Sequence, residues 1–260
     1  MKIHQIRNAT VLIKYGGKKF LVDPYLAEKE VYPGFEGTVN SHLRNPRVEL
    51  KTPMETILDV DAVIVTHLHA DHWDEAAVKI VPKGLKIFAQ NYTDAELLKA
   101  QGFTDVNLLT FETKIGNVTL TRTPGQHGSD QALFIAGELL GSVCGVVFRA
   151  EGEKTLYLSG DTVWNDYVVK NLETYSPEVV VVPAGDAQVP GLGSIIMNTA
   201  DIRKLYDAAP KSRIVANHLD AVNHCVLSRA ELRDFLKQNQ MEDRVFVPED
   251  GEELDGLALH

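Results

Sequence analysis

The segment Thr66–His72, which reads Thr-His-Leu-His-Ala-Asp-His, constrains the fold of this chain more than any other stretch. It follows residues 61–65, whose apolar and β-branched side chains predict a buried strand. It precedes residues 73–80, where apolar residues recur at helical spacing. Three histidines and one aspartate therefore lie on a tight strand-to-helix connection. Imidazole and carboxylate groups are ligands of divalent transition metals, so we predict a metal site at this connection.

The spacing within this segment predicts two groups of ligands. His67 and His69 are two residues apart in an extended stretch, so both side chains can point to one side. Asp71 and His72 follow where the chain turns, and they can aim at a second point nearby. The alternative is a polar loop that is rich in histidine and binds no metal. We favour the metal site because this pattern at a strand end has few other uses.

The pattern HxHxDH resembles the signature of the metallo-β-lactamase superfamily. The resemblance extends over nearly the whole chain, and the most similar branch is that of ascorbate-phosphate lactonase-like metal-dependent hydrolases. It implies a single domain over residues 1–260 with an α/β fold, the four-layer αββα sandwich, in which two sheets face each other with helices outside. The chain departs from many relatives in its first turn, where residues 7–10 read Arg-Asn-Ala-Thr in place of Gly-His-Ser or Gly-His-Ala.

The resemblance also implies the remaining metal ligands, each at the end of a predicted strand. His127 lies in a glycine-rich turn, Asp161 follows Ser-Gly, and His218 directly follows an apolar stretch. Two divalent cations are implied; affinity favours zinc over manganese, and iron is also compatible. The implied ligands are His67, His69 and His127 for one cation, Asp71, His72 and His218 for the second, and Asp161 as the bridge between them.

Two further residues have open roles. His224 is the rival of His218 for the last ligand position; because His218 directly follows the strand, we expect His224 to face the substrate. Asp23 ends a predicted strand in Asp-Pro. It either hydrogen-bonds a ligand histidine or serves only as a turn residue, and the sequence does not decide between these roles.

The resemblance implies a hydrolase in which a metal-bound hydroxide attacks a small ester, lactone or phosphoester. Asp71 would also orient the hydroxide, and His224 would donate a proton to the leaving group or bind the substrate. One alternative is a phosphodiesterase acting on nucleotides or RNA. The other is a non-catalytic metal-binding or sensor protein with the same fold.

Charge and composition limit the partners. The chain has 26 basic and 36 acidic residues, a net charge of −10, which argues against nucleic acid as a partner. A small substrate, including an anionic one held by a local basic residue, is compatible with this charge. No apolar run reaches the length of a membrane span, and the first residues lack the pattern of a signal peptide. With only two cysteines and no CxxC pair, we expect a cytoplasmic protein.

Residues 26–51 form a long stretch with little periodicity, and its aromatic residues predict an active-site lid. Arg44 or Arg47 would pair there with an anionic substrate group, or remain solvated.

Thr52 is expected to cap a short helix. The predicted strands are 2–7, 11–15, 19–22, 61–65, 85–89, 106–109, 118–122, 132–136, 143–150, 155–158, 178–182, 213–216 and 245–247. The predicted helices are 52–59, 73–80, 93–101, 165–174, 198–208 and 228–238, and the acidic tail after Pro248 is expected to be loosely held.

Overall fold

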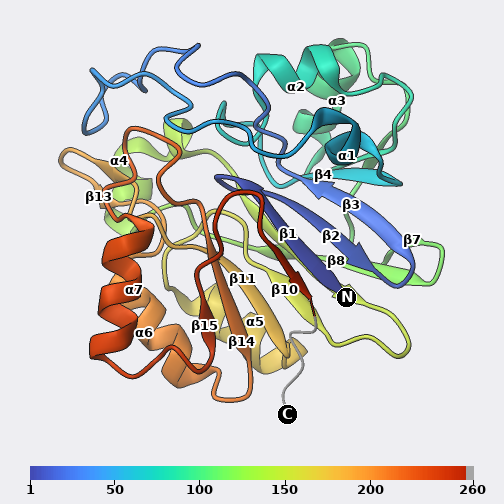
Figure 1. Ribbon diagram of the computed structural model, residues 1–260. Coiled ribbons are helices and arrows are strands. Elements are labelled where there is room, and N and C mark those ends of the chain that lie inside the picture. The colour runs from blue at the N-terminus through green and yellow to red at the C-terminus, as the bar shows by residue number, and fades with distance from the viewer. Residues whose placement is uncertain (256–260) are drawn as a thin grey trace.

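Two seven-stranded sheets face each other in the computed structural model, which describes residues 1–255 (Figure 1). In spatial order the first sheet contains β16 (Glu253–Asp255), β1 (Lys2–Arg7), β2 (Thr10–Tyr15), β3 (Lys18–Val22), β4 (Ala62–Val65), β5 (Ile87–Ala89) and β6 (Val106–Leu108). The second contains β15 (Val245–Phe246), β14 (Arg213–Asn217), β11 (Val179–Pro183), β10 (Leu156–Leu158), β9 (Cys144–Arg149), β8 (Val118–Pro124) and β7 (Thr113–Ile115). A separate ribbon pairs β12 (Gln188–Val189) with β13 (Gly193–Ser194).

The strands of the two sheets run so that several carboxyl ends meet at one edge. In the second sheet, β10, β11 and β14 are parallel. Strand β9 is antiparallel to both β8 and β10, so β8 runs in the same direction as β10. In the first sheet, β3 and β4 are parallel. The loops that follow these strands are therefore brought together, which is the usual place for a site in a sheet of this kind.

Side chains at alternate positions of the central strands pack into two different hydrophobic cores. Val179 and Val181 of β11 lie in the core between the sheets, whereas Val180 and Val182 lie in the outer core of the second sheet. This is the expected pattern for a strand covered on both faces. The core between the sheets also holds Phe20 and Phe148, whose rings meet edge to face at 5.4 Å. Full burial of each such side chain stabilises the fold by roughly 1.5–3 kcal/mol.

Helices cover the outer face of each sheet and complete four layers. The outer core of the first sheet contains side chains of α1 (Met54–Leu58), α2 (Glu75–Ile80) and α3 (Tyr92–Ala100). The outer core of the second contains side chains of α5 (Asp166–Tyr175), α6 (Thr199–Ala208) and α7 (Arg229–Gln238). Figure 1 shows α1, α2 and α3 on one side of the sheets and α6 and α7 on the opposite side. The αββα sandwich expected from the sequence is confirmed.

One predicted strand is a helix. Residues 132–136 belong to α4 (Asp130–Leu140), which begins where the side chain of Ser129 accepts a hydrogen bond from the backbone N–H of Ala132. Buried Ala132 and Leu140 face inward from this helix. A short apolar run does not by itself distinguish a strand from a buried helix, and the capping serine was the overlooked signal.

The ends of two other elements also differ from the prediction. The residue that caps α1 is Pro53, without a side-chain hydrogen bond, and Oγ1 of Thr52 instead lies 3.4 Å from Nε2 of His4. The tail after Pro248 is held as far as residue 255, because β16 pairs antiparallel with β1 and Asp250 is buried in an ion pair with Arg229. Residues 256–260 of that tail lie outside the described part. Among residues 1–255, no helix has the length and apolar character needed to cross a bilayer.

Candidate metal centre

All seven predicted ligands lie on loops at the carboxyl ends of strands from both sheets. His67, His69, Asp71 and His72 follow β4 of the first sheet. The three ligands from the second sheet follow β8, β10 and β14; they are His127, Asp161 and His218. Because β8, β10 and β14 run in the same direction, their loops meet at one edge and face the loop after β4.

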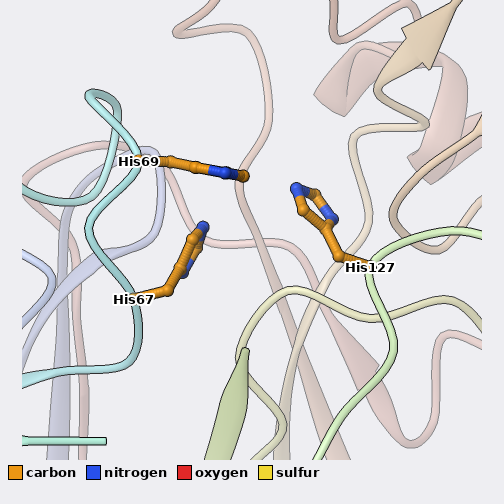
Figure 2. Close-up of side chains that lie close together, drawn as sticks. All are labelled: His67, His69 and His127. Carbon is orange, nitrogen blue, oxygen red and sulfur yellow. The ribbon is translucent and has the colours of Figure 1, made fainter. Parts of the chain in front are cut away.

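His67, His69 and His127 form the first group. Figure 2 shows His67 and His69 projecting from one loop toward His127, which projects from the opposite side. The ring centroids of His67 and His69 lie 4.5 Å apart, and that of His127 lies 5.7 Å from His67 and 5.2 Å from His69. One potential ligand atom from each residue lies within 4.8 Å of the others, so the group can hold one cation.

Asp71, His72 and His218 form the second group, and each is buried. Nε2 of His218 lies 3.2 Å from Nε2 of His72 and 3.2 Å from Oδ2 of Asp71. Asp161 lies between the two groups. Its Oδ2 atom is 3.1 Å from Nε2 of His72, 3.5 Å from Nε2 of His218 and 3.9 Å from Nε2 of His127. This carboxylate is therefore placed where it can contact cations in both groups.

Outer hydrogen bonds fix which ring nitrogen of the first group points inward. Nδ1 of His127 donates to the backbone oxygen of Ile195 at 2.8 Å, which leaves Nε2 inward. Nδ1 of His67 lies 3.2 Å from the hydroxyl of Thr66, so its Nε2 also points inward. His69 is turned the other way, because its Nε2 lies 3.1 Å from the backbone oxygen of Leu139. Partners of this kind orient the ligand rings before a metal binds.

The second group has outer partners as well. Nδ1 of His72 lies 2.9 Å from Oδ2 of Asp23, and Nδ1 of His218 lies 3.4 Å from Sγ of Cys225. Asp23 is held by Thr66, whose backbone N–H and hydroxyl each donate to it at 2.7 Å. Of the two roles considered for Asp23, the structure thus shows the hydrogen bond to a histidine, His72, which is one of the predicted ligands.

The two groups differ in charge. Burial lowers the pKa of His67 well below its usual value and lowers the pKa of His127 to about 4, so both rings are neutral near pH 7. Burial also opposes charge on His72, but the surrounding carboxylates, led by Asp161, outweigh it and raise the pKa of His72 to about 10. The neutral imidazoles of His67 and His127 are ready to ligate, whereas a cation in the second group must replace the proton on His72.

The donor set fits divalent cations. Nε2 of His67 is buried, points toward the other two histidines of its group, and has no hydrogen-bond partner among residues 1–255 (Figure 2). A buried nitrogen without a partner is costly, and a bound metal would satisfy it. Three histidines in one group, and two histidines with a carboxylate in the other, are the ligands that zinc, manganese and iron accept.

His224 lies beside the second group and is not part of it. Its side chain is buried, and Nδ1 has no hydrogen-bond partner among the described residues. The ring of Phe35 packs edge to face against its imidazole at 5.1 Å. His218, and not His224, therefore joins Asp71 and His72, as the sequence favoured.

Asn223 attaches the segment 26–51 to the site, a role that the sequence did not predict. Its Oδ1 accepts hydrogen bonds from the Phe35 backbone N–H at 3.0 Å and from Nδ2 of Asn45 at 2.8 Å. Its Nδ2 donates to Oγ1 of Thr38 and to the backbone oxygen of Val39. This buried amide thereby holds Phe35 next to His224. No local pattern indicates such a contact, because the partners are 178–188 residues apart in the chain.

Arg44, one of the two arginines considered as a partner of a substrate anion, bonds to the backbone of its own segment. Nε and Nη2 of Arg44 donate to the backbone oxygens of Glu30 and Val31, at 2.7 and 2.8 Å. Arg44 thus stabilises the segment that contains it. Arg47 is exposed. Pairing of Arg44 or Arg47 with a substrate anion stays a prediction, and the bonds that Arg44 makes in this structure are to the backbone of its own segment.

Comparisons with known proteins agree with this geometry. Residues 18–219 match the family model described as a beta-lactamase superfamily domain. The chain is 48% identical over 253 residues to UPF0173 protein YddR of Bacillus subtilis, which covers 97% of this chain and 98% of that protein. It is 27% identical over 257 residues to a UPF0173 metal-dependent hydrolase of Pyrococcus abyssi, which covers 98% and 99% of the two chains.

Solved structures extend the comparison. A structure described as an isothiocyanate hydrolase from Delia radicum gut bacteria has a TM-score of 0.95 and 47% identity, covering 98% of both chains. A possible metal-dependent hydrolase from Veillonella parvula has a TM-score of 0.96 and 43% identity over the same share of both chains. The chain therefore belongs to the metallo-β-lactamase superfamily, and within it to the UPF0173 group of metal-dependent hydrolases.

Proposed function

We propose that this hydrolase acts on small uncharged electrophiles, and first among them organic isothiocyanates. The observation that carries the hydrolytic part of the proposal is the position of Asp161 between two groups of ligand atoms from opposite sheets. The substrate class is supported by the likeness to the isothiocyanate hydrolase, at 47% identity over 98% of both chains. Small esters and lactones, which present a similar electrophilic carbon, are the second candidate class.

In this proposal the centre holds two divalent cations, with zinc favoured and manganese or iron also accepted. When bound, such a pair supplies a water of lowered pKa and polarises the atom under attack. The proposed ligands are His67, His69 and His127 for one cation, Asp71, His72 and His218 for the other, and Asp161 for both. Asp71, whose Oδ2 lies 3.2 Å from Nε2 of His218, has the further proposed role of accepting a hydrogen bond that orients the attacking water.

The proposed reaction adds one water to the substrate. The water oxygen bonds to the central carbon of the N=C=S group, and the bond from that carbon to nitrogen breaks. Both protons of the water end on nitrogen, so the products are a primary amine and carbonyl sulfide. The nitrogen must therefore be protonated twice, which requires polar groups close to the leaving side of the substrate.

His224 is the proposed group on that side. Its unpartnered Nδ1 is available for a hydrogen bond to the substrate. Burial lowers the pKa of His224 to about 4, so the ring is neutral near pH 7 and would bind the substrate without bringing a charge. Phe35 belongs to residues 26–51, the segment that we propose to act as an active-site lid. Its ring provides an apolar surface next to His224.

The charges around the site favour an uncharged substrate over a phosphoester. In residues 1–255, no recorded ion pair brings a lysine or arginine to the seven proposed ligands. A phosphate group is normally met by such a side chain. The net charge of −10 likewise disfavours nucleic acid as a substrate. The two buried cysteines, which are not in a disulfide, are consistent with the cytoplasmic location that we propose.

The test is a substrate panel with zinc-loaded protein. The panel contains an alkyl isothiocyanate, an aryl ester, a lactone and a bis-aryl phosphodiester, and amine and carbonyl sulfide are measured for the first. We expect kcat/KM for the isothiocyanate to exceed that for each other substrate by about a hundredfold or more. The variant His67→Ala, which loses a proposed ligand, should lose this activity. His4→Ala should retain it, because His4 lies on β1, outside residues 26–51, and its ring contacts the backbone of Gly251.

Other results select other functions. Preference for the ester or lactone would replace the isothiocyanate with the second candidate class. Preference for the phosphodiester would favour the phosphodiesterase alternative. No turnover of any substrate by protein that carries two bound cations would overturn the hydrolytic proposal and favour a metal-binding protein without catalysis.

A further inference from the structure

The backbone of Asn8 connects the first turn of the chain to the last proposed ligand. Asn8 lies between β1 and β2, is fully buried, and has the left-handed backbone angle φ +54°. Its backbone oxygen accepts hydrogen bonds from the backbone N–H of His218 at 2.9 Å and from Nε2 of Gln5 at 2.8 Å. The turn of the first sheet and the ligand loop of the second sheet are therefore joined at this residue.

The side chain of Asn8 faces the second ligand group. Its Nδ2 lies 3.1 Å from the backbone oxygen of Asp71, 3.5 Å from Oδ2 of Asp71 and 3.4 Å from Nε2 of His218. The reversed amide would place Oδ1 against two oxygens of Asp71, which would repel it. The hydrogen-bond network thus identifies the inward group as the NH2 donor.

We propose that Asn8 is a positioning residue for the second cation group, and that it sets the affinity of that group separately from the first. The proposal rests on the two-cation centre described under the proposed function. In the described part of the chain, the recorded side-chain hydrogen bonds of Asn8 reach Asp71 and His218 and none of the histidines of the first group. A hydrogen bond to a ligating carboxylate fixes its orientation, and losing such a bond typically weakens metal binding 10- to 100-fold.

The favourable and unfavourable contributions of this amide to folding oppose each other, because Nδ2 donates to the backbone oxygen of Asp71 whereas Oδ1 lacks a partner among residues 1–255. Oδ1 of Asn8 is buried and has no hydrogen-bond partner among residues 1–255, an arrangement that lowers stability. The left-handed backbone of Asn8 suits glycine better than asparagine. Asn8→Gly therefore removes the amide without straining the turn, and the backbone hydrogen bonds of residue 8 can remain.

The experiment is an equilibrium zinc titration of the full-length protein against a chromophoric chelator. For Asn8→Gly we expect the first equivalent to bind as in the unmodified chain and the second to bind 10- to 100-fold more weakly, with the melting temperature of the metal-free protein unchanged. The matched control is Gln240→Gly, which also removes an amide side chain from a left-handed residue (φ +55°) but is exposed after α7. It should bind both equivalents normally.

Three outcomes would overturn the proposal. Two equivalents bound by Asn8→Gly with unchanged affinities would show that Asn8 has no positioning role, while leaving the two-cation centre intact. Equal weakening of both equivalents, or a lowered melting temperature, would show a general structural role. A single equivalent bound by the unmodified chain would overturn the two-cation centre itself, and the role of Asn8 with it.

Discussion

Oδ2 of Asp23 lies 2.9 Å from Nδ1 of His72 and accepts the hydroxyl of Thr66 at 2.7 Å. Both carboxylate oxygens of Asp23 therefore accept hydrogen bonds, because its Oδ1 accepts the backbone N–H of Thr66. The contact turns Nε2 of His72 toward Asp161. A carboxylate at the end of β3 therefore determines how a histidine after β4 presents its ligand atom.

We expect Asp23→Asn to weaken zinc binding by about 10- to 100-fold, because one of the two acceptor oxygens becomes an NH2 donor that cannot accept from Thr66 or His72. The competition titration with a chromophoric chelator measures the change. Asp61→Asn is the control, since Asp61 also accepts a backbone N–H on the same sheet but lies away from the site. Equal zinc affinity in Asp23→Asn and the unmodified chain would contradict the role given to Asp23.

Gly160 precedes Asp161 and should not tolerate a side chain. A Cβ atom there would lie 2.1 Å from the backbone oxygen of Cys144, and the residue has φ +62°. We expect Gly160→Ala to lower the free energy of unfolding by more than about 2 kcal/mol and to displace Asp161. Gly152→Ala is the matched control, because Gly152 has φ +77° with open space around its Cβ position, so only backbone strain of about 1–2 kcal/mol applies. Urea unfolding compares the two, and equal losses would contradict the steric argument.

The stability of the chain should depend on pH through His224. Burial lowers the pKa of His224 in the folded state to about 4, from 6.5. Below pH 6.5, His224 therefore binds a proton in the unfolded chain but not in the folded chain. The neutral imidazole of His224 therefore contributes to the free energy of unfolding above pH 6.5, and this contribution is lost as the pH falls toward 4. His224→Gln should remove about 2 kcal/mol of the loss between pH 7 and pH 5.

Urea midpoints of the metal-free proteins at the two pH values measure this difference. The exposed histidine variant His42→Gln should change in parallel with the unmodified chain. If the loss in His224→Gln equals that of the unmodified chain, the imidazole of His224 is not desolvated as the structure indicates.

Removal of zinc from the zinc-loaded protein should lower its stability. A ligand at 100 times its Kd contributes about 2.7 kcal/mol, which corresponds to a melting temperature roughly 5–10 °C higher in a chain of this size. Scanning calorimetry before and after treatment with a chelator measures the shift. His67→Ala should show a much smaller shift on zinc addition, because it lacks the inward Nε2 of the first group. A full shift in that variant would place the binding elsewhere.

Local patterns predicted most of the fold. The run Val179–Val182 indicated a strand covered on both faces, and Ser228 with Glu231 indicated the start of α7, where both hydrogen bonds of the capping box form. The prediction was wrong for 132–136, because that apolar run suits a strand as well as a helix. Pairing of the tail with β1 was also missed, since contacts between chain ends leave no local pattern.

In the candidate site, too, some residues were predictable from local sequence patterns and others were not. Its predicted ligands could be identified as candidates because each is a histidine or aspartate at a strand end, in an order that resembles a known family, and the structure brings them together. Asn8 and Asn223 could not be found, because their side chains act across 63 and 178 residues of sequence. An amide has no residue-type signal for such a role, and only the packed structure shows which atoms it meets.

The division of the ligands between the two sheets has a physical consequence. His67, His69, Asp71 and His72 belong to the part of the chain before β7, and the other three belong to the part after it. Neither part alone carries all the ligands proposed for either cation. For the proposed two-cation centre, metal release and separation of the sheets would be thermodynamically coupled. A molecule opened between its halves would lose its metal, and dissolved cations would favour reassociation of two fragments cut before β7.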